Sequence, residues 1–278
     1  MKLAINGFGR IGRTILRQVL ALPQGSDIEL VLINDIAPLA TCAYLFKYDS
    51  TFGPYAGEVS EGNSALVVDG QAIPMTHSSD LANIDLSGVD VLLDCTGIAR
   101  TSDVARRGLA AGAGKVLISG PSPAAEVTVV LGANEDQLGG AHVVSNASCT
   151  TNCLAPVAKV LNDSFGIESG LMTTVHAYTN DQNVQDQPHK DPYRARGAAQ
   201  NIIPTSTGAA SPVSLAIPDL KGKLTGIAMR VPVATGSVVD LTVNLAKETS
   251  AEEINAAIQA AAEGPLKGIL CYSEDPLV

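Results

Sequence analysis

A cysteine among small hydroxyl-bearing residues is the strongest sign of chemistry in this sequence. Cys149 stands in the run Ser-Asn-Ala-Ser-Cys-Thr-Thr-Asn-Cys at residues 145–153, between an extended run and apolar residues with helical spacing. A thiol in the first turn of a helix lies at the positive end of the helix dipole, which favours the thiolate. Backbone donors of that turn and the hydroxyls of Ser148 and Thr150 can also hold an oxyanion or a phosphate. The pattern therefore predicts a nucleophilic cysteine.

Such a nucleophile needs a base or a cationic partner. The chain has four histidines, of which His176 follows the apolar run 172–175 and is expected at a strand end facing a site. His77 and His142 are interpreted as ordinary loop or surface histidines. A histidine at a strand end is more often structural, so spacing alone does not pair His176 with Cys149.

A second cysteine, Cys153, lies one helical turn beyond Cys149. Two ligands do not make a structural zinc site, and residues four apart on a helix aim their Cβ atoms poorly for a disulfide. We therefore predict no metal site and interpret Cys153 as a small buried hydrophobic residue.

Three glycines, Gly7, Gly9 and Gly12, form a Gly-x-Gly-x-x-Gly turn between an expected strand and an expected helix. The first glycine allows a tight turn, the second lets the backbone approach a pyrophosphate, and the third lets helix and strand pack closely. Asp35, at the end of the next expected strand, is placed to bind the adenosine ribose hydroxyls. Its charge would repel a 2'-phosphate, so NAD is favoured over NADP. A plain strand–turn–helix corner remains the alternative.

The first half of the chain alternates apolar strands with helical stretches, which is typical of an α/β fold. This pattern predicts a Rossmann-type doubly wound sheet over residues 1–148. The expected strands are 2–6, 28–33, 89–93 and 115–118, and the expected helices are 11–22 and 102–113.

After residue 148 the pattern changes to that of an α+β domain, which we expect to be the catalytic domain, 149–278. The polar segment 179–201 has no periodicity and is long enough to suggest a function. The other expected elements are helices 149–164 and 251–263 and strands 171–178, 224–231 and 238–245.

Composition excludes several classes of protein. The 278 residues are 46% hydrophobic, enough for a substantial core, yet no apolar run could span a bilayer. A net charge of -10 argues against a broad nucleic-acid surface, so any anion site must be built locally. The five cysteines have no disulfide-framework spacing and no secretory signal is visible, so we predict a cytoplasmic protein.

Four segments, in order along the chain, resemble one family: the phosphorylating glyceraldehyde-3-phosphate dehydrogenases. The resemblance also extends over residues 226–241. The four segments are Asn-Gly-Phe-Gly-Arg-Ile-Gly (6–12), the cysteine run (145–153), Thr-Val-His-Ala-Tyr-Thr (174–179) and Ile-Pro-Thr-Ser-Thr-Gly-Ala-Ala (203–210).

The resemblance implies an NAD-dependent oxidation of glyceraldehyde 3-phosphate to 1,3-bisphosphoglycerate, through a thiohemiacetal and a thioester on Cys149, with His176 as its partner. It implies that the cofactor contacts Gly7, Phe8, Gly9, Arg10, Ile11, Gly12, Asp35, Thr96, Gly97, Ser119 and Asn180. It further implies that Thr179 and Arg230 bind the substrate phosphate, and that Ser148, Thr150, Arg194, Thr207 and Gly208 bind inorganic phosphate. The family is usually a homotetramer, which we expect here.

This sequence departs from the family in three places, one of which is Ser211, where a lysine is common. Ile98 and Ala99 stand where an arginine and an aromatic residue usually follow Thr-Gly. Family members also continue past the end of this sequence, so we expect the chain to lack their C-terminal segment. Two alternatives stay open. One is an erythrose-4-phosphate dehydrogenase, which shares the cysteine and the histidine but releases a free acid. The other, suggested by the missing segment, is a truncated nucleotide-binding protein without catalytic activity.

Overall fold

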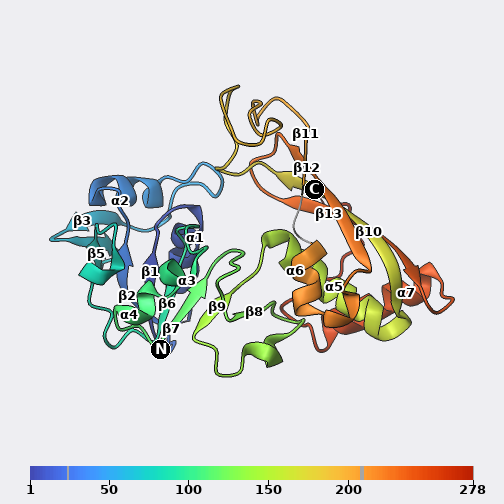
Figure 1. The fold of residues 1–278 in the computed structure, drawn as a ribbon. Coiled ribbons are helices and arrows are strands. Elements are labelled where there is room, and N and C mark those ends of the chain that lie inside the picture. Colours follow the sequence, from blue (N-terminus) through green and yellow to red (C-terminus); the bar gives the residue numbers. More distant parts are fainter. Residues whose placement is uncertain (24, 207–209, 278) are drawn as a thin grey trace. The chain divides into compact units, whose positions relative to one another are not determined.

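The chain forms two compact units (Figure 1), each of which is described here by itself. The computed structural model describes residues 1–23, 25–206 and 210–277. The first unit consists of Met1–Thr128 and Leu138–Ala147, and the second of Val129–Gln137 and Ser148–Val278. The predicted division after residue 148 differs from these units in two places. Val129–Gln137 precedes the division in sequence yet lies in the second unit, and the second unit resumes at Ser148 rather than at Cys149.

Within its described residues, the first unit is built on a nine-stranded sheet with the order β3-β4-β5-β2-β1-β6-β7-β9-β8. The neighbouring strands from β5 through β2, β1, β6, β7 and β9 to β8 pair in parallel. At the other end of the sheet, β3, β4 and β5 pair antiparallel. The predicted α/β class with a Rossmann-like sheet is confirmed. The strands are β1 (Lys2–Asn6), β2 (Glu29–Asn34), β3 (Val59–Gly62), β4 (Ala65–Val68), β5 (Gln71–Thr76), β6 (Val91–Asp94), β7 (Lys115–Ile118), β8 (Val127–Thr128) and β9 (Val143–Ser145).

Helices cover both faces of this sheet, because alternate residues of the buried strands point to opposite faces. On β1, Leu3 and Ile5 join the core with α1 and α2, whereas Ala4 joins the core on the side of α3 and α4. The helices are α1 (Arg10–Leu20), α2 (Leu39–Lys47), α3 (Ser102–Ala105) and α4 (Arg107–Ala110), with a short 3-10 turn at Leu81–Asn83. A second 3-10 turn, Glu135–Leu138, lies mostly in the segment that belongs to the second unit.

The single helix expected at 102–113 is wrong, because α3 and α4 are separated at Arg106. Just after this break, the backbone at Gly108 lies close against β6 and β7. A Cβ at Gly108 would lie 2.4 Å from a side-chain carbon of Leu92 and 2.8 Å from one of Val116. The close contact between Gly108 and the sheet accounts for the break in a stretch whose composition favours a continuous helix.

The second unit contains, among the residues described, a four-stranded sheet with the order β11-β12-β10-β13. The long helix α5 and the C-terminal helix α7 contact each other, and α5 also contacts β10 and β13. Between β10 and β11 the described chain forms no helix or strand, as the polar segment 179–201 predicts. The elements are α5 (Cys149–Phe165), β10 (Ile167–Ala177), β11 (Ile203–Ser206), α6 (Ala210–Ala216), β12 (Leu224–Val231), β13 (Ser237–Leu245) and α7 (Ala251–Glu263), with a 3-10 turn at Pro218–Leu220.

Candidate active site

The sequence places a thiol at the very start of a helix. Ser148 is the N-cap of α5, and its hydroxyl accepts a hydrogen bond of 3.1 Å from the backbone N–H of Thr151. Cys149, the first residue of the helix, is exposed. The cap therefore holds the helix start in place and leaves the sulfur accessible at the positive end of the helix dipole.

His176 lies against this thiol. It is the penultimate residue of β10, 8% exposed, and its Nε2 lies 3.0 Å from Cys149 Sγ. On the other side of the ring, Nδ1 lies 2.7 Å from the carbonyl oxygen of Ala177. A proton on Nδ1 satisfies that carbonyl, so Nε2 is the atom that exchanges a proton with the sulfur. The structure brings together the two residues that sequence spacing alone did not pair.

The contact shifts both groups toward an ion pair. The hydrogen bond from His176 is the largest cause that lowers the pKa of Cys149, and contacts with Thr150 lower it further against the effect of partial burial. The pKa of His176 is raised, first by its hydrogen bond to Cys149. The pair therefore favours thiolate and imidazolium, the reactive form of a cysteine nucleophile.

Cys153 provides an internal contrast one helical turn away. Partial desolvation raises the pKa of its thiol, and the neighbouring Cys149 adds to this effect. The expectation that Cys153 is buried is wrong, because its side chain is exposed. Two exposed thiols of one helix thus differ in ionisation because only Cys149 has the histidine.

Arg230 extends the site along the sheet. It pairs with His176 in the register of the parallel strands β10 and β12. Its Nη1 donates to the carbonyl of Ala177 (3.0 Å) and to the Thr179 hydroxyl (3.1 Å). Its Nε is buried without a hydrogen-bond partner among the described residues, and burial lowers the pKa of the guanidinium. A cation with an unused buried donor fits an anion-binding role.

Asp181, which the sequence reasoning missed, connects two predicted phosphate ligands. Its carboxylate accepts hydrogen bonds from the Thr179 hydroxyl and from Arg194 Nη1. Partial burial opposes ionisation of Asp181, but the Thr179 hydroxyl and the charges of Arg194 and Arg230 outweigh it and hold the pKa below its usual range. Arg194 is also held by Thr205, whose hydroxyl accepts from Nε at 3.2 Å. Nothing in the sequence pattern distinguishes Asp181 from other acids of the polar segment.

In the first unit, the three glycines of the turn differ in what an added Cβ atom would meet. A Cβ at Gly7, where φ is +93°, would lie 2.9 Å from the backbone of Cys95, and one at Gly12 would lie 2.2 Å from the carbonyl oxygen of Gly7. A Cβ at Gly9 would meet nothing within 4 Å. Gly7 and Gly12 are therefore required by the fold, whereas Gly9 borders open space that a ligand can approach.

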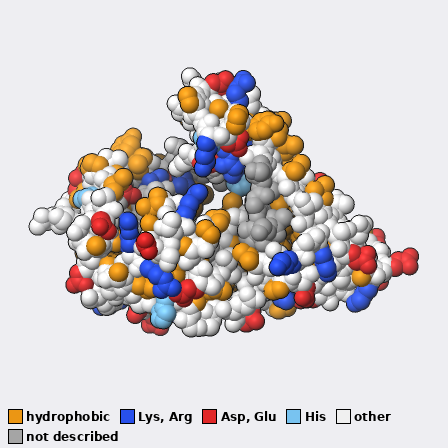
Figure 2. Space-filling model, in the orientation of Figure 1, with side chains coloured by type: hydrophobic (Ala, Val, Ile, Leu, Met, Phe, Trp, Pro, Cys, Tyr) orange, Lys and Arg blue, Asp and Glu red, His pale blue; other side chains and the backbone are white. Residues whose placement is uncertain are grey.

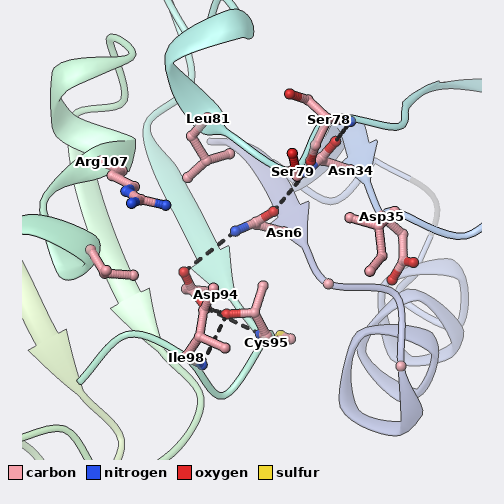
Figure 3. A pocket seen from close by; sticks show the side chains of 15 residues that line it. Asn6, Asn34, Asp35, Ser78, Ser79, Leu81, Asp94, Cys95, Ile98 and Arg107 are labelled. Atoms are coloured by element: carbon pink, nitrogen blue, oxygen red, sulfur yellow. Dashed lines mark hydrogen bonds between the residues drawn. The ribbon is translucent and has the colours of Figure 1, made fainter. Parts of the chain in front are cut away.

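A pocket of about 300 Å³ opens at the ends of β1, β2 and β6. Strand order reverses between β1 and β6, the place where doubly wound sheets bind ligands. Figure 3 shows its polar floor, where the Asn34 amide donates to Asn6 (2.8 Å) and the Asn6 amide faces Asp94 (3.4 Å). Asp35 lies at its edge, with its carboxylate accepting from the backbone N–H groups of Phe8 and Ala37.

The remaining predicted cofactor contacts differ in their surroundings. Thr96 lines the pocket, and Gly97 and Ser119 follow the ends of β6 and β7. The Phe8 side chain packs in the core against Phe46, with ring centroids 6.0 Å apart, so a contact between Phe8 and a dinucleotide would have to use the backbone.

Two further predicted contacts, Arg10 and Ile11, lie on α1. Arg10 forms an ion pair with Asp49, and Ile11 is exposed. Asn180 is exposed and belongs to the second unit, and its predicted contact with the nicotinamide stays a prediction. The predicted phosphate ligands Thr207 and Gly208 lie outside the described residues.

Two further features of the described chain bear on its class. No group of three or more histidine, cysteine, aspartate or glutamate side chains in the ranges that the structure describes is arranged to hold a metal ion. None of the helices described there is long and apolar enough to cross a membrane. What the geometry offers is a paired thiol and imidazole beside arginines in one unit, and a glycine-edged pocket with an aspartate at its edge in the other.

Comparisons with known proteins match both halves of the chain to family models and the whole chain to named relatives. Residues 1–102 match the family described as "Glyceraldehyde 3-phosphate dehydrogenase, NAD binding domain", and residues 148–278 match "Glyceraldehyde 3-phosphate dehydrogenase, C-terminal domain". A protein of Streptomyces coelicolor named glyceraldehyde-3-phosphate dehydrogenase is 53% identical over 283 residues, covering 100% of this chain and 84% of its own length. Relatives of that name from Geobacillus stearothermophilus and Bacillus subtilis are each 53% identical over 282 residues, with 83% of their length covered.

Proposed function

This chain belongs to the glyceraldehyde-3-phosphate dehydrogenase family, and we propose on that basis that it oxidises glyceraldehyde 3-phosphate to 1,3-bisphosphoglycerate with NAD and inorganic phosphate. The observation that carries the proposal is the 3.0 Å contact between Cys149 Sγ and His176 Nε2 at the start of α5. The enzyme is therefore an oxidoreductase of glycolysis, as the sequence predicts, and binds NAD(H).

Cys149 is the nucleophile of this proposal. Its thiolate attacks the aldehyde carbon, and the carbonyl oxygen takes the proton from His176 Nε2, which leaves a thiohemiacetal. The Nδ1 contact with Ala177 holds the imidazole in the orientation that both transfers need. His176 Nε2 then takes this proton back as the thiohemiacetal is oxidised to a thioester. NAD, when bound, supplies the hydride acceptor for this oxidation.

The two arginines divide the anion binding. We assign the substrate phosphate to Arg230 and Thr179, which already contact each other at 3.1 Å. We assign inorganic phosphate to Arg194, together with Ser148 and Thr150 at the helix start and with Thr207 and Gly208. The Ser148 hydroxyl also caps α5, so a phosphate contact there would be shared with the cap. Phosphate attack on the thioester carbon then releases the Cys149 thiolate and forms the acyl phosphate.

The cofactor site of the first unit fits NAD rather than NADP. Gly9 leaves the space in which a pyrophosphate can approach the backbone. The carboxylate of Asp35, at the edge of the pocket, can accept from ribose hydroxyls and repels a 2'-phosphate. Thr96, Gly97 and Ser119 at neighbouring strand ends complete the proposed set in this unit.

We further propose that the chain assembles as a homotetramer and acts in the cytoplasm. Large apolar side chains are exposed in and beside the polar segment 179–201, among them Val184 (76%), Tyr193 (61%) and Ile202 (69%). Hydrophobic side chains also reach the surface on the face in Figure 2. Exposed apolar patches of this kind favour protein contacts. The five cysteines are all free, which suits a reducing compartment. Light scattering tests the assembly, and a monomer at assay concentration would contradict it.

The test of function is NADH formation from NAD and glyceraldehyde 3-phosphate, measured with and without inorganic phosphate. We expect turnover that requires phosphate and that disappears in Cys149→Ser, with Cys153→Ser as the matched control that keeps activity. Phosphate-independent oxidation with preference for erythrose 4-phosphate would support the acid-releasing alternative instead. NAD binding without any turnover would support the non-catalytic alternative.

A further inference from the structure

Arg107 is a cation inside the cofactor pocket that the protein itself does not use. It begins α4 and lines the pocket, and Figure 3 shows its guanidinium extending from the helix toward the side of the pocket where Leu81 and Asn6 lie. No described residue forms a hydrogen bond or an ion pair with its side chain. The preceding residue is different: Arg106 forms an ion pair of 2.6 Å with Glu126. A half-buried guanidinium with five free donors in a pocket is available to a ligand.

The charge of the pocket argues against an anion as that ligand. Two carboxylates, those of Asp35 and Asp94, line the same pocket as the single guanidinium of Arg107. Both carboxylates are already engaged, Asp35 by backbone N–H groups and Asp94 by Thr96. An anion bound by Arg107 would meet these negative charges without the backbone N–H groups that the glycine turn can offer to a pyrophosphate. A neutral group with lone pairs has no such penalty and can still accept from the guanidinium.

The walls indicate that this neutral group has an apolar face. Ile36 and Ile98 both line the pocket, and both are exposed, at 77% and 59%. Leu81 and Val104 line it as well. Covering large, exposed hydrophobic side chains at a pocket with a flat apolar surface is favourable, because it removes apolar area from water. A purine base has such faces and carries ring nitrogens with lone pairs at its edge.

From these observations we propose that Arg107 recognises the base of the cofactor, by donating hydrogen bonds to ring nitrogens of adenine while Ile36 and Ile98 contact the ring. The proposal rests on the proposed NAD site, because Asp35 and Gly9 of the same pocket then hold the adenosine ribose and the pyrophosphate. Arg107 is thus a specificity residue that selects an acceptor-bearing base, on the first turn of a short helix packed against the sheet.

The test compares Arg107→Met with Arg106→Met as the matched control on the same surface. Dissociation constants are measured by calorimetry for NAD, AMP, ribose 5-phosphate and nicotinamide mononucleotide. We expect R107M to weaken NAD and AMP by the same factor, about tenfold or more, as for a lost hydrogen bond to a charged donor. Binding of ribose 5-phosphate and nicotinamide mononucleotide, which lack adenine, should not change. R106M should bind all four ligands like the unmodified chain.

Several outcomes would overturn the proposal. If R107M binds AMP within twofold of the unmodified chain, Arg107 has no role at the base. If R107M loses equal affinity for AMP and for ribose 5-phosphate, Arg107 acts at the phosphate instead. If R107M does not fold, Arg107→Lys keeps the stem and charge but loses the planar fork. It should still lose AMP affinity selectively, and unchanged AMP binding by it would also contradict the proposal. An unmodified chain that does not bind NAD at all would reject the proposed function, whereas normal NAD binding with an indifferent R107M rejects only this inference.

Discussion

Replacing His176 by asparagine removes the cationic partner of Cys149 while keeping a side chain that can form hydrogen bonds. In the structure the imidazole Nε2 is 3.0 Å from the sulfur and is the largest cause that lowers the pKa of the thiol. The Thr150 contacts and the start of α5 remain in the variant and continue to favour the thiolate to a smaller degree. His176→Asn should therefore return the thiol most of the way to ordinary behaviour.

The expected magnitude follows from the thiolate population. A thiol of ordinary pKa, about 8.5, is about 3% ionised at pH 7, so loss of the partner can cost up to about thirtyfold in reactive species. A thiolate of higher pKa is intrinsically a better nucleophile, with a Brønsted coefficient of about 0.4–0.5, which offsets part of that loss. We expect alkylation of Cys149 at pH 7 to slow by roughly tenfold.

The assay is the rate of alkylation by iodoacetamide, a neutral reagent, followed by mass spectrometry so that Cys149 and Cys153 are scored separately. In the unmodified chain the rate at Cys149 should be nearly constant where the ion pair is already formed. In His176→Asn it should rise close to tenfold per pH unit below the new pKa. Cys153 should react slowly near neutral pH in both, because its pKa is raised. A variant that alkylates at Cys149 as fast as the unmodified chain at pH 7, with a flat profile, would refute the ion-pair reasoning.

Three further predictions follow from other contacts. Gly9→Ala should leave the melting temperature unchanged but weaken NAD at least tenfold by calorimetry, whereas Gly12→Ala should lower the melting temperature, because only its Cβ meets a carbonyl at 2.2 Å. Equal melting temperatures for the two variants would contradict this difference. Arg230→Gln should lower kcat/KM for glyceraldehyde 3-phosphate by about tenfold to a hundredfold, and an equal loss with unphosphorylated glyceraldehyde would contradict a phosphate role. Ser250→Ala removes the capping box of α7, in which the hydroxyl accepts from Glu253 N–H at 3.2 Å. It should cost about 1 kcal/mol, or about 2–4 °C by calorimetry, and an unchanged transition would show that this helix end frays in the folded chain.

Local sequence signals predicted the parts of the molecule that are built from neighbours in the chain. The glycine turn, the apolar strands and the start of α5 each have all their determinants within a few residues. The strands β3 to β5 were not predicted. Val59–Gly62 and Gln71–Thr76 mix polar and apolar residues and lack the continuous apolar run that indicated the central strands. Helix α2 was likewise missed, since its apolar residues are too evenly spread to mark one face.

The parts of the site that depend on distant residues could not be read in this way. The pairing of Cys149 with His176 joins a helix start to a strand end, and only the resemblance suggested it. Asp181 and Arg107 carry no sequence signal at all, because their roles come from which charges lie beside them after folding. The prediction that Cys153 is buried was wrong for the same reason. Helical spacing fixes the direction of its side chain relative to Cys149 but does not show which residues cover it.

The segment Val129–Gln137 makes the two units interleaved rather than consecutive, since the chain passes between them at 128–129, 137–138 and 147–148. Within the second unit this segment is not peripheral, because a Cβ at Gly132 would lie 2.9 Å from Leu266 near the end of the described chain. No single division of the chain therefore separates the two units completely. A chimaera joined at residue 148 would inherit nine residues of the wrong parent inside its second unit, so recombination between relatives should exchange 129–137 together with everything after 147.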